Sequence, residues 1–154
     1  MQLHPSHPGR YPEHLVAPMR SDLTQYGIEE VRTPEAVDAA LAPGSGNVLL
    51  VINSVCGCAA GKARPAIGMA LRHTVKPDRA VTVFAGADVE AVAHLRTGKL
   101  AEVPPSSPSM ALFRNGELLH VVHRRDIESS DAVTLAGRLA QLFEQYCAAE
   151  PVAG

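Results

Sequence analysis

The sequence lacks both a large excess of charge and any long hydrophobic run. Its formal net charge is −2, which gives no reason to expect a nucleic-acid partner. The densest basic cluster, His123-Arg124-Arg125, is too short to be a basic arm. No stretch approaches the ~18 consecutive apolar residues that indicate a membrane-spanning helix. We therefore expect neither a nucleic-acid partner nor a membrane partner.

The N-terminus also lacks the apolar segment of a secretory signal peptide, and its opening residues MQLHPSHPGRYPEH are rich in proline instead. This favours a cytoplasmic location, where thiols are kept reduced. Only three cysteines are present among 154 residues, which is too few for a structural disulfide framework. A Cys-x-Cys pair in such a protein is expected to be reactive or metal-binding.

The length of 154 residues and the hydrophobic content of 46% suit one domain with one core. We expect an extended lead-in over residues 1–14, the folded domain over 15–147 and a frayed tail over 148–154. Periodicity and turn residues predict helices at 15–26, 34–41, 59–73 and 88–95, and a last helix after Ser129 or Ser130. The predicted strands are 28–32, 47–53, 80–85, 110–113 and 118–122.

Two helices carry more specific expectations. The apolar stripe of the last helix should consist of Val133, Ala136, Leu139, Leu142, Phe143 and Tyr146. Pro65 lies within the predicted 59–73 helix, where its missing N–H should kink or delay the helix.

The order of elements predicts an α/β fold with a mixed central sheet. Residues 47–53 read NVLLVIN, the pattern of a strand that is buried on both faces. Strands that alternate with helices pair in parallel through crossovers. Asn115-Gly116 lies between two apolar runs and predicts a hairpin that adds an antiparallel edge. Helices should cover both faces of this sheet, which gives three layers.

The stretch VCGCA, residues 55–59, places two cysteines directly after the buried strand and before a helix. Free N–H groups in the first turn of a helix favour thiolate over thiol, and the thiolate is the nucleophile. We expect Cys56 to be the exposed attacking thiol and Cys58 the resolving thiol. Gly57 removes bulk between them and lets the backbone approach a substrate. Lys62 and Arg64 could add a weak favourable field.

Two other interpretations of the pair remain open at this stage. Buried cysteines often pack as small hydrophobic residues. A zinc site would need two further ligands, but Cys147 lies far away in the last helix, and His120 and His123 would fall on opposite faces of a strand. Cys147 itself is expected to be a packing residue.

A redox pair between a buried strand and a helix, followed by Ser107-Pro108-Ser109 and an edge hairpin, resembles the thioredoxin fold. In that superfamily a cis proline faces the active cysteines. The resemblance implies that Pro108 is this residue and that Pro65 is the helix-kinking proline. It also implies a substrate groove whose walls are the turn Asn53-Ser54, the loop Ser106-Ser107 and the backbone at Pro108-Ser109.

More specifically, the chain resembles the bacilliredoxins, small thioredoxin-like proteins with a Cys-Gly-Cys motif. The matching segments are Tyr11-Pro12, residues 15–41, VINSVCGCAAGKARPA at 51–66 and PPSSPSMALFRNGELLH at 104–120. The chain departs from the family in its longer His- and Pro-rich N-terminus and in Cys147 near the C-terminus.

The resemblance implies a thiol–disulfide oxidoreductase that removes bacillithiol, or a similar low-molecular-weight thiol, from mixed disulfides on oxidised proteins. Cys56 would take up the thiol, and Cys58 or a second thiol would resolve the adduct. The partners are then S-thiolated client proteins, and the low-molecular-weight thiol is a co-substrate, with no bound cofactor or metal. The alternatives are a disulfide isomerase or reductase, and a non-enzymatic redox sensor or metal-binding module that uses the same pair.

Overall fold

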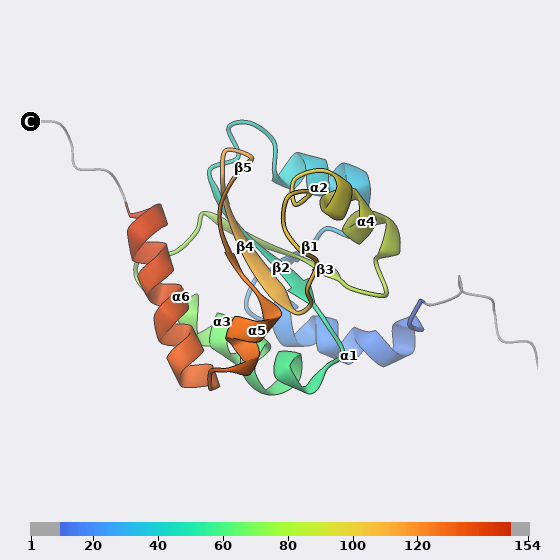
Figure 1. The fold of residues 1–154 in the computed structure, drawn as a ribbon, viewed down its shortest axis with the longest axis horizontal. Helices are drawn as coiled ribbons and strands as arrows, with labels where there is room; N and C mark the ends of the chain where they lie inside the picture. Colours follow the sequence, from blue (N-terminus) through green and yellow to red (C-terminus); the bar gives the residue numbers. More distant parts are fainter. Residues whose placement is uncertain (1–9, 149–154) are drawn as a thin grey trace, which may run out of the picture.

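The computed structural model describes residues 10–148 and places a five-stranded mixed sheet at the centre of the molecule (Figure 1). The strand order is β1-β3-β2-β4-β5. β1 and β2 both pair in parallel with β3, whereas β4 runs antiparallel to β2 and to β5. The strands are β1 (Glu29–Glu30), β2 (Asn47–Asn53), β3 (Arg79–Phe84), β4 (Ser109–Arg114) and β5 (Glu117–Val122).

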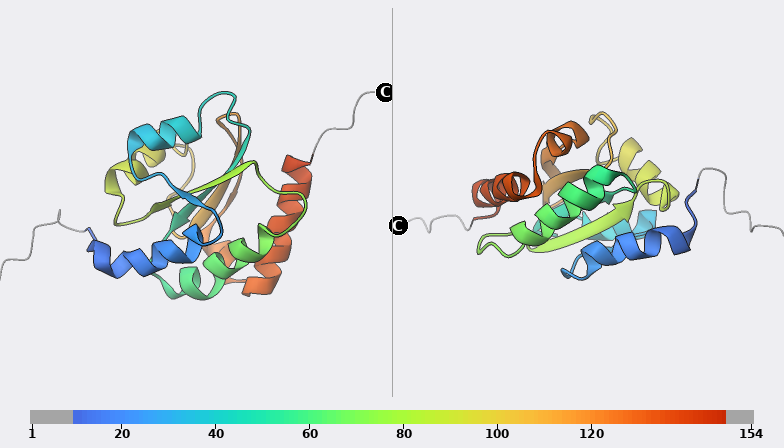
Figure 2. Two further views of the ribbon diagram at one scale, coloured as in Figure 1. Left: turned by 180° about the vertical axis from the view of Figure 1, so that it is seen from behind. Right: turned by 90° about the horizontal axis from the view of Figure 1, so that it is seen from below.

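Helices cover both faces of the sheet, as Figures 1 and 2 show. The side chains of β2 alternate between two cores: Leu49 and Val51 pack with α3 and α6, and Leu50 and Ile52 pack with α2 and α4. The helices are α1 (Glu13–Thr24), α2 (Pro34–Ala40), the π-helix η1 (Ala59–Ala63), α3 (Arg64–Ala70), α4 (Val89–Thr97), α5 (Arg124–Glu128) and α6 (Ala132–Cys147). The predicted three-layer α/β fold is confirmed.

The predicted hairpin is also confirmed. Asn115 and Gly116 form the turn between β4 and β5, with φ of 51° and 85°. A two-residue turn with positive φ at both positions matches the twist of the strands that it joins. It makes β5 an antiparallel edge strand beside β4.

The ends of several helices differ from the predicted ones. α1 begins at Glu13, two residues before the predicted start. The predicted 59–73 helix starts as the π-helix η1 and continues as the α-helix α3, which ends at Ala70. The π-helix ends at Ala63, two residues before Pro65, which has no N–H to continue a regular helix. Residues 1–9 of the predicted lead-in (1–14) and residues 149–154 of the predicted tail (148–154) lie outside the described residues.

The C-terminal part of the chain contains the larger corrections. Helix α5 was not predicted, because five residues are too few to show a helical period. The N-cap of α6 is Asp131 rather than Ser129 or Ser130, and its carboxylate accepts a 2.7 Å bond from the backbone N–H of Thr134. That bond lowers the pKa of Asp131. Val133 does not belong to the buried stripe of α6, since it is 73% exposed.

A buried ion pair fixes α1 to the turn between β3 and α4. Arg20 donates two 2.8 Å hydrogen bonds to Asp88, and both side chains are almost fully buried. Asp88 also accepts the backbone N–H of Phe84, and the Arg20 guanidinium lies over the Phe84 ring. Burial by itself would lower the pKa of Arg20, but its bonds to Asp88 and Glu13 outweigh this and raise the pKa.

We predict that Asp88→Ala lowers the free energy of unfolding by about 3–5 kcal/mol, because it leaves the buried guanidinium of Arg20 without its main partner. Urea denaturation of the reduced protein measures this. In the control Glu29→Ala, which removes only the exposed pair with Arg79, the change should stay within about 0.5 kcal/mol. Equal losses in the two variants would contradict the structural role of Asp88.

Candidate active site

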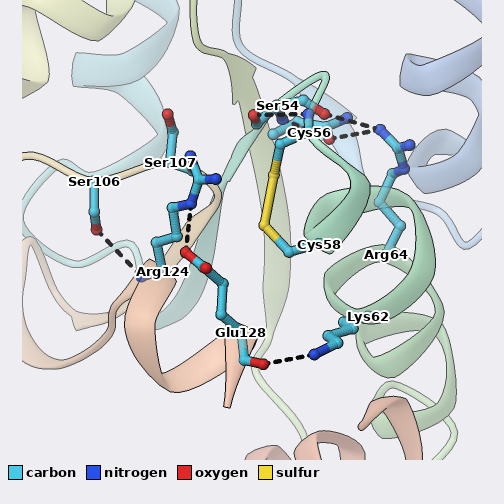
Figure 3. The surroundings of a disulfide bond; sticks show 10 residues. Ser54, Cys56, Cys58, Lys62, Arg64, Ser106, Ser107, Arg124 and Glu128 are labelled. Atoms are coloured by element: carbon cyan, nitrogen blue, oxygen red, sulfur yellow. Dashed lines mark hydrogen bonds and ion pairs between the residues drawn. A yellow bond between two sulfur atoms is a disulfide. The ribbon is translucent and has the colours of Figure 1, made fainter. Parts of the chain in front are cut away.

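The two cysteines lie where the buried strand β2 gives way to a helix, and they form a disulfide (Figure 3). Their Cα atoms are 5.5 Å apart, and both residues are partly exposed. The carbonyl of Cys56 accepts the N–H groups of Ala59 at 3.0 Å and Ala60 at 3.2 Å. Cys56 thus sits at the start of the first helical turn, a position that favours a thiolate when the pair is reduced.

A network of buried polar groups shapes the turn before Cys56. Ser54 lies at its centre: its backbone N–H donates to Asn53 Oδ1 at 2.9 Å, and its Oγ accepts the N–H of Cys56 at 3.2 Å. Arg64 Nη1 donates to Asn53 Oδ1 at 3.1 Å and to the Ser54 carbonyl at 3.2 Å. The position of the Cys56 backbone is therefore set by side chains that are themselves buried.

Asn53 is not a wall of a groove, contrary to the prediction. Its side chain is buried, with its amide donating to the Met19 carbonyl at 3.1 Å, so that it ties the end of β2 to α1. It faces the interior because it continues the alternation of a strand that is buried on both faces. Its part in the site is to hold the turn that carries Cys56.

The two predicted cations have different surroundings. Arg64 is buried under the turn and is ion-paired to Asp22 at 3.2 Å. Burial lowers the pKa of Arg64, and the charge of Asp22 opposes that shift. Lys62 instead donates to the carbonyl of Glu128 in α5. Arg64 is thus the cation that contacts the turn before the cysteines, whereas Lys62 joins η1 to α5.

The cis proline lies beside this turn. The Ser107–Pro108 peptide bond is cis, as predicted. In the antiparallel pairing of β2 with β4, Ile52 is opposite Ser109. The residues that follow Ile52 therefore lie beside those that precede Ser109. This brings the loop of residues 106–108, the proline loop, next to the turn of residues 54–58, the cysteine turn. The Ser109 side chain is buried, and its Oγ donates to the Ser106 carbonyl at 2.9 Å, so that it supports the loop from inside.

Cys56 opens onto a hollow of about 420 Å³, which Ser54 and Ser107 also line. Cys58 does not line it and packs instead against the larger hydrophobic core. The two cysteines, both partly exposed, thus have different environments: Cys56 lines the hollow, and Cys58 packs against the core. Gly57 is exposed, and a Cβ on it would meet no atom within 4 Å apart from those of the two flanking cysteines.

Tyr11 and Arg124 also line the hollow, and neither was predicted to belong to the site. Tyr11 docks through its backbone N–H, which donates to the Gly86 carbonyl at 2.8 Å. Its ring lies over Gly86, where a Cβ would come within 2.6 Å of the ring. Arg124 reaches the hollow from α5. The only sequence signal for Arg124 was the basic cluster that appeared too short for nucleic acid.

The metal-binding interpretation finds no further ligands near the pair. Within residues 10–148, no three His, Cys, Asp or Glu side chains are grouped so that they could hold a metal ion.

Across the same residues, no helix has the length and hydrophobicity needed to cross a bilayer.

Comparison with known proteins identifies the family to which the chain is similar. Residues 11–147 match the family model described as Disulphide isomerase. A bacilliredoxin of Koribacter versatilis is 50% identical, over 90% of this chain and 95% of its own length. A bacilliredoxin of Halalkalibacterium halodurans is 49% identical, over 89% of this chain and 94% of its own.

Solved structures support the fold. A mutant thioredoxin from Halobacterium salinarum superposes with a TM-score of 0.55 at 22% identity, over 80% of this chain and 93% of its own. The oxidised thioredoxin from Plasmodium falciparum gives 0.54 at 18% identity, over 79% and 99%. The chain therefore belongs to the bacilliredoxin family and is a thiol–disulfide oxidoreductase with the thioredoxin fold.

Proposed function

We propose that the protein removes bacillithiol, or a similar low-molecular-weight thiol, from mixed disulfides on oxidised client proteins in the cytoplasm. The observation that carries this proposal is the unequal setting of the two sulfurs: Cys56 opens onto a hollow, and Cys58 packs against the core. The family relationship to proteins named bacilliredoxin supports it.

The exchange takes two steps. The Cys56 thiolate attacks the sulfur of the small thiol, the mixed disulfide breaks, and the client leaves as a thiolate that takes up a proton. The Cys58 thiolate then attacks the Cys56 sulfur and releases the small thiol. The mixed disulfide has gained two electrons, one at the client sulfur and one at the sulfur of the small thiol, which also leaves as a thiolate and takes up a proton. The pair has lost two electrons and become the Cys56–Cys58 disulfide. A second thiol could resolve the adduct in place of Cys58. No bound cofactor is needed, because the small thiol leaves as a product.

Disulfide isomerisation is the second candidate, favoured by the description of the matching family model. The two functions need different reduction potentials. A potential near roughly −180 mV against glutathione suits an isomerase, whereas one near −270 mV suits a reductant. We expect the reductant value, and a markedly more oxidising pair would favour the isomerase.

Cys147 takes no part in the proposed exchange. It lies at the end of α6, packed against the larger core, and is a free thiol. Burial raises the pKa of Cys147 to about 11, with the charge of Asp78 adding to the shift and that of Arg114 opposing it. At neutral pH this residue is therefore protonated and a poor nucleophile.

We predict that Cys56→Ala reduces the removal of bacillithiol from a thiolated client to the uncatalysed rate. Cys58→Ala should instead accumulate one bacillithiol per chain on Cys56, because the resolving thiol is missing. Intact mass spectrometry of both proteins over time measures each outcome. The proposal fails if Cys56→Ala clears the client as fast as the parent.

A second prediction concerns Cys147. In the reduced protein at pH 8, iodoacetamide should label Cys147 about 100-fold more slowly than Cys56, because only about one Cys147 in 1,000 is then a thiolate. The labelling of Cys147 should rise as the pH approaches 11. Peptide mapping after timed quenching measures both rates. Cys147→Ala should exchange at the parental rate, and a large loss would give Cys147 a role in the reaction.

A further inference from the structure

Helix α5 holds one cation at the edge of the Cys56 hollow. The Arg124 guanidinium donates from Nη1 to the Ser107 carbonyl at 3.3 Å and from Nε to Glu128 at 2.6 Å. The backbone N–H of Arg124 contacts Ser106 Oγ at 3.4 Å. Figure 3 shows Arg124 between the proline loop and Glu128, with Cys56 and Cys58 beside it. Arg124 is thus fixed to the same loop that lies next to the cysteines.

Arg124 retains capacity for a further anion. A guanidinium has five N–H donors, and the two side-chain bonds of Arg124 leave others free. Glu128 offsets its charge only in part, because Arg125 lies beside it in α5 and Lys62 contacts the end of the same helix. Asp126 also lies in α5, so the charged side chains of α5 and Lys62, five in all, sum to a net charge of about +1, and Arg124 is the one among them that lines the hollow.

Space for a ligand extends to both sides of Arg124. It lines the 420 Å³ hollow at Cys56, and it also lines a second hollow of about 440 Å³ beside Pro105 and His123. A small thiol joined through its sulfur to Cys56 would occupy the first hollow, with the rest of the molecule within the walls to which Arg124 belongs. A carboxylate there would meet a planar donor that can bind it through paired hydrogen bonds.

We propose that Arg124 is the specificity residue of the exchange site, and that it selects low-molecular-weight thiols that carry a carboxylate. It binds the carboxylate while the sulfur of the same molecule is exchanged at Cys56. The inference rests on the proposed function and names the chemical class of its small thiol. Arg124 takes no part in bond making; it acts on binding.

The test uses one single-cysteine client thiolated with either 3-mercaptopropionate or 3-mercaptopropionamide. These two thiols have the same shape and differ in the carboxylate. The parent protein should remove 3-mercaptopropionate, the acid, from the client with a higher kcat/KM than it shows for 3-mercaptopropionamide, the amide. Arg124→Gln should lower kcat/KM for the acid by about tenfold, mainly through KM, and change that for the amide by less than about twofold. Arg124→Lys, which keeps the charge, should recover part of the preference.

Two further variants sharpen the test. Glu128→Gln removes the carboxylate that competes for Arg124, so it should increase the preference for the acid. Arg79→Gln makes the same change of charge at the far end of β3, in an exposed pair with Glu29, and should leave both substrates unaffected.

The outcomes distinguish a failure of the role proposed for Arg124 from a failure of the proposed exchange function. If Arg124→Gln slows the acid and the amide equally, Arg124 only supports the loop, and the inference is overturned. If the parent clears both clients at one rate, the inference also fails, while the exchange function stands. If the parent clears neither these clients nor a bacillithiolated one, the proposed function fails and the inference falls with it.

Discussion

The site depends on the antiparallel pairing of β4 with β2. Ile52 and Ser109 are opposite each other in that ladder, so the chain that leaves β2 toward Cys56 runs beside the chain that enters β4 through Pro108. A shift of one residue would turn every side chain of β4 to the opposite face of the sheet. The two cores on either side of β2 prevent such a shift. The hydrophobic burial of two strands thereby sets the distance between the cysteine turn and the proline loop.

The pairing of β4 with its neighbours also sets the position of Arg124, the cation of the site. The tight turn at Asn115-Gly116 returns β5 alongside β4, and α5 follows directly from the end of β5. Arg124 therefore arrives at the proline loop, where it donates to the Ser107 carbonyl. The edge hairpin contributes no residue to the exchange itself. Its length and register deliver α5 to the hollow.

A buried ion pair stabilises the wall of the hollow opposite Arg124. Arg20 and Asp88 join α1 to the turn after β3, and the chain before α1 docks there through Tyr11 and Gly86. On the inner side, Arg64 and Asn53 satisfy the polar groups of the turn that carries Cys56. Buried polar groups need such partners, since an unpaired one costs free energy. The turn after β3 and the turn that carries Cys56 are thus tied to neighbouring elements by buried hydrogen bonds.

The sequence by itself determined the fold class and the reactive pair. NVLLVIN marks a strand buried on both faces, Asn115-Gly116 marks the hairpin, and the cysteines follow the strand directly; all of these are local patterns. The family resemblance supplied the cis geometry of Pro108, which no local pattern shows. Helix α5 and the true N-cap of α6 were missed, because a short helix has no period and Ser129, Ser130 and Asp131 are all good caps.

Only the tertiary structure decided which side chains face the hollow. Asn53 and Ser109 are buried because they lie in strands that are covered on both faces. Tyr11 and Arg124 join Cys56 in one hollow although they are far from it in the sequence. The difference between the two cysteines also comes from the tertiary structure, since Cys56 lines the hollow and Cys58 packs against the core. These features depend on contacts between distant segments, and such contacts are set by the packing of the sheet and its helices rather than by any local pattern.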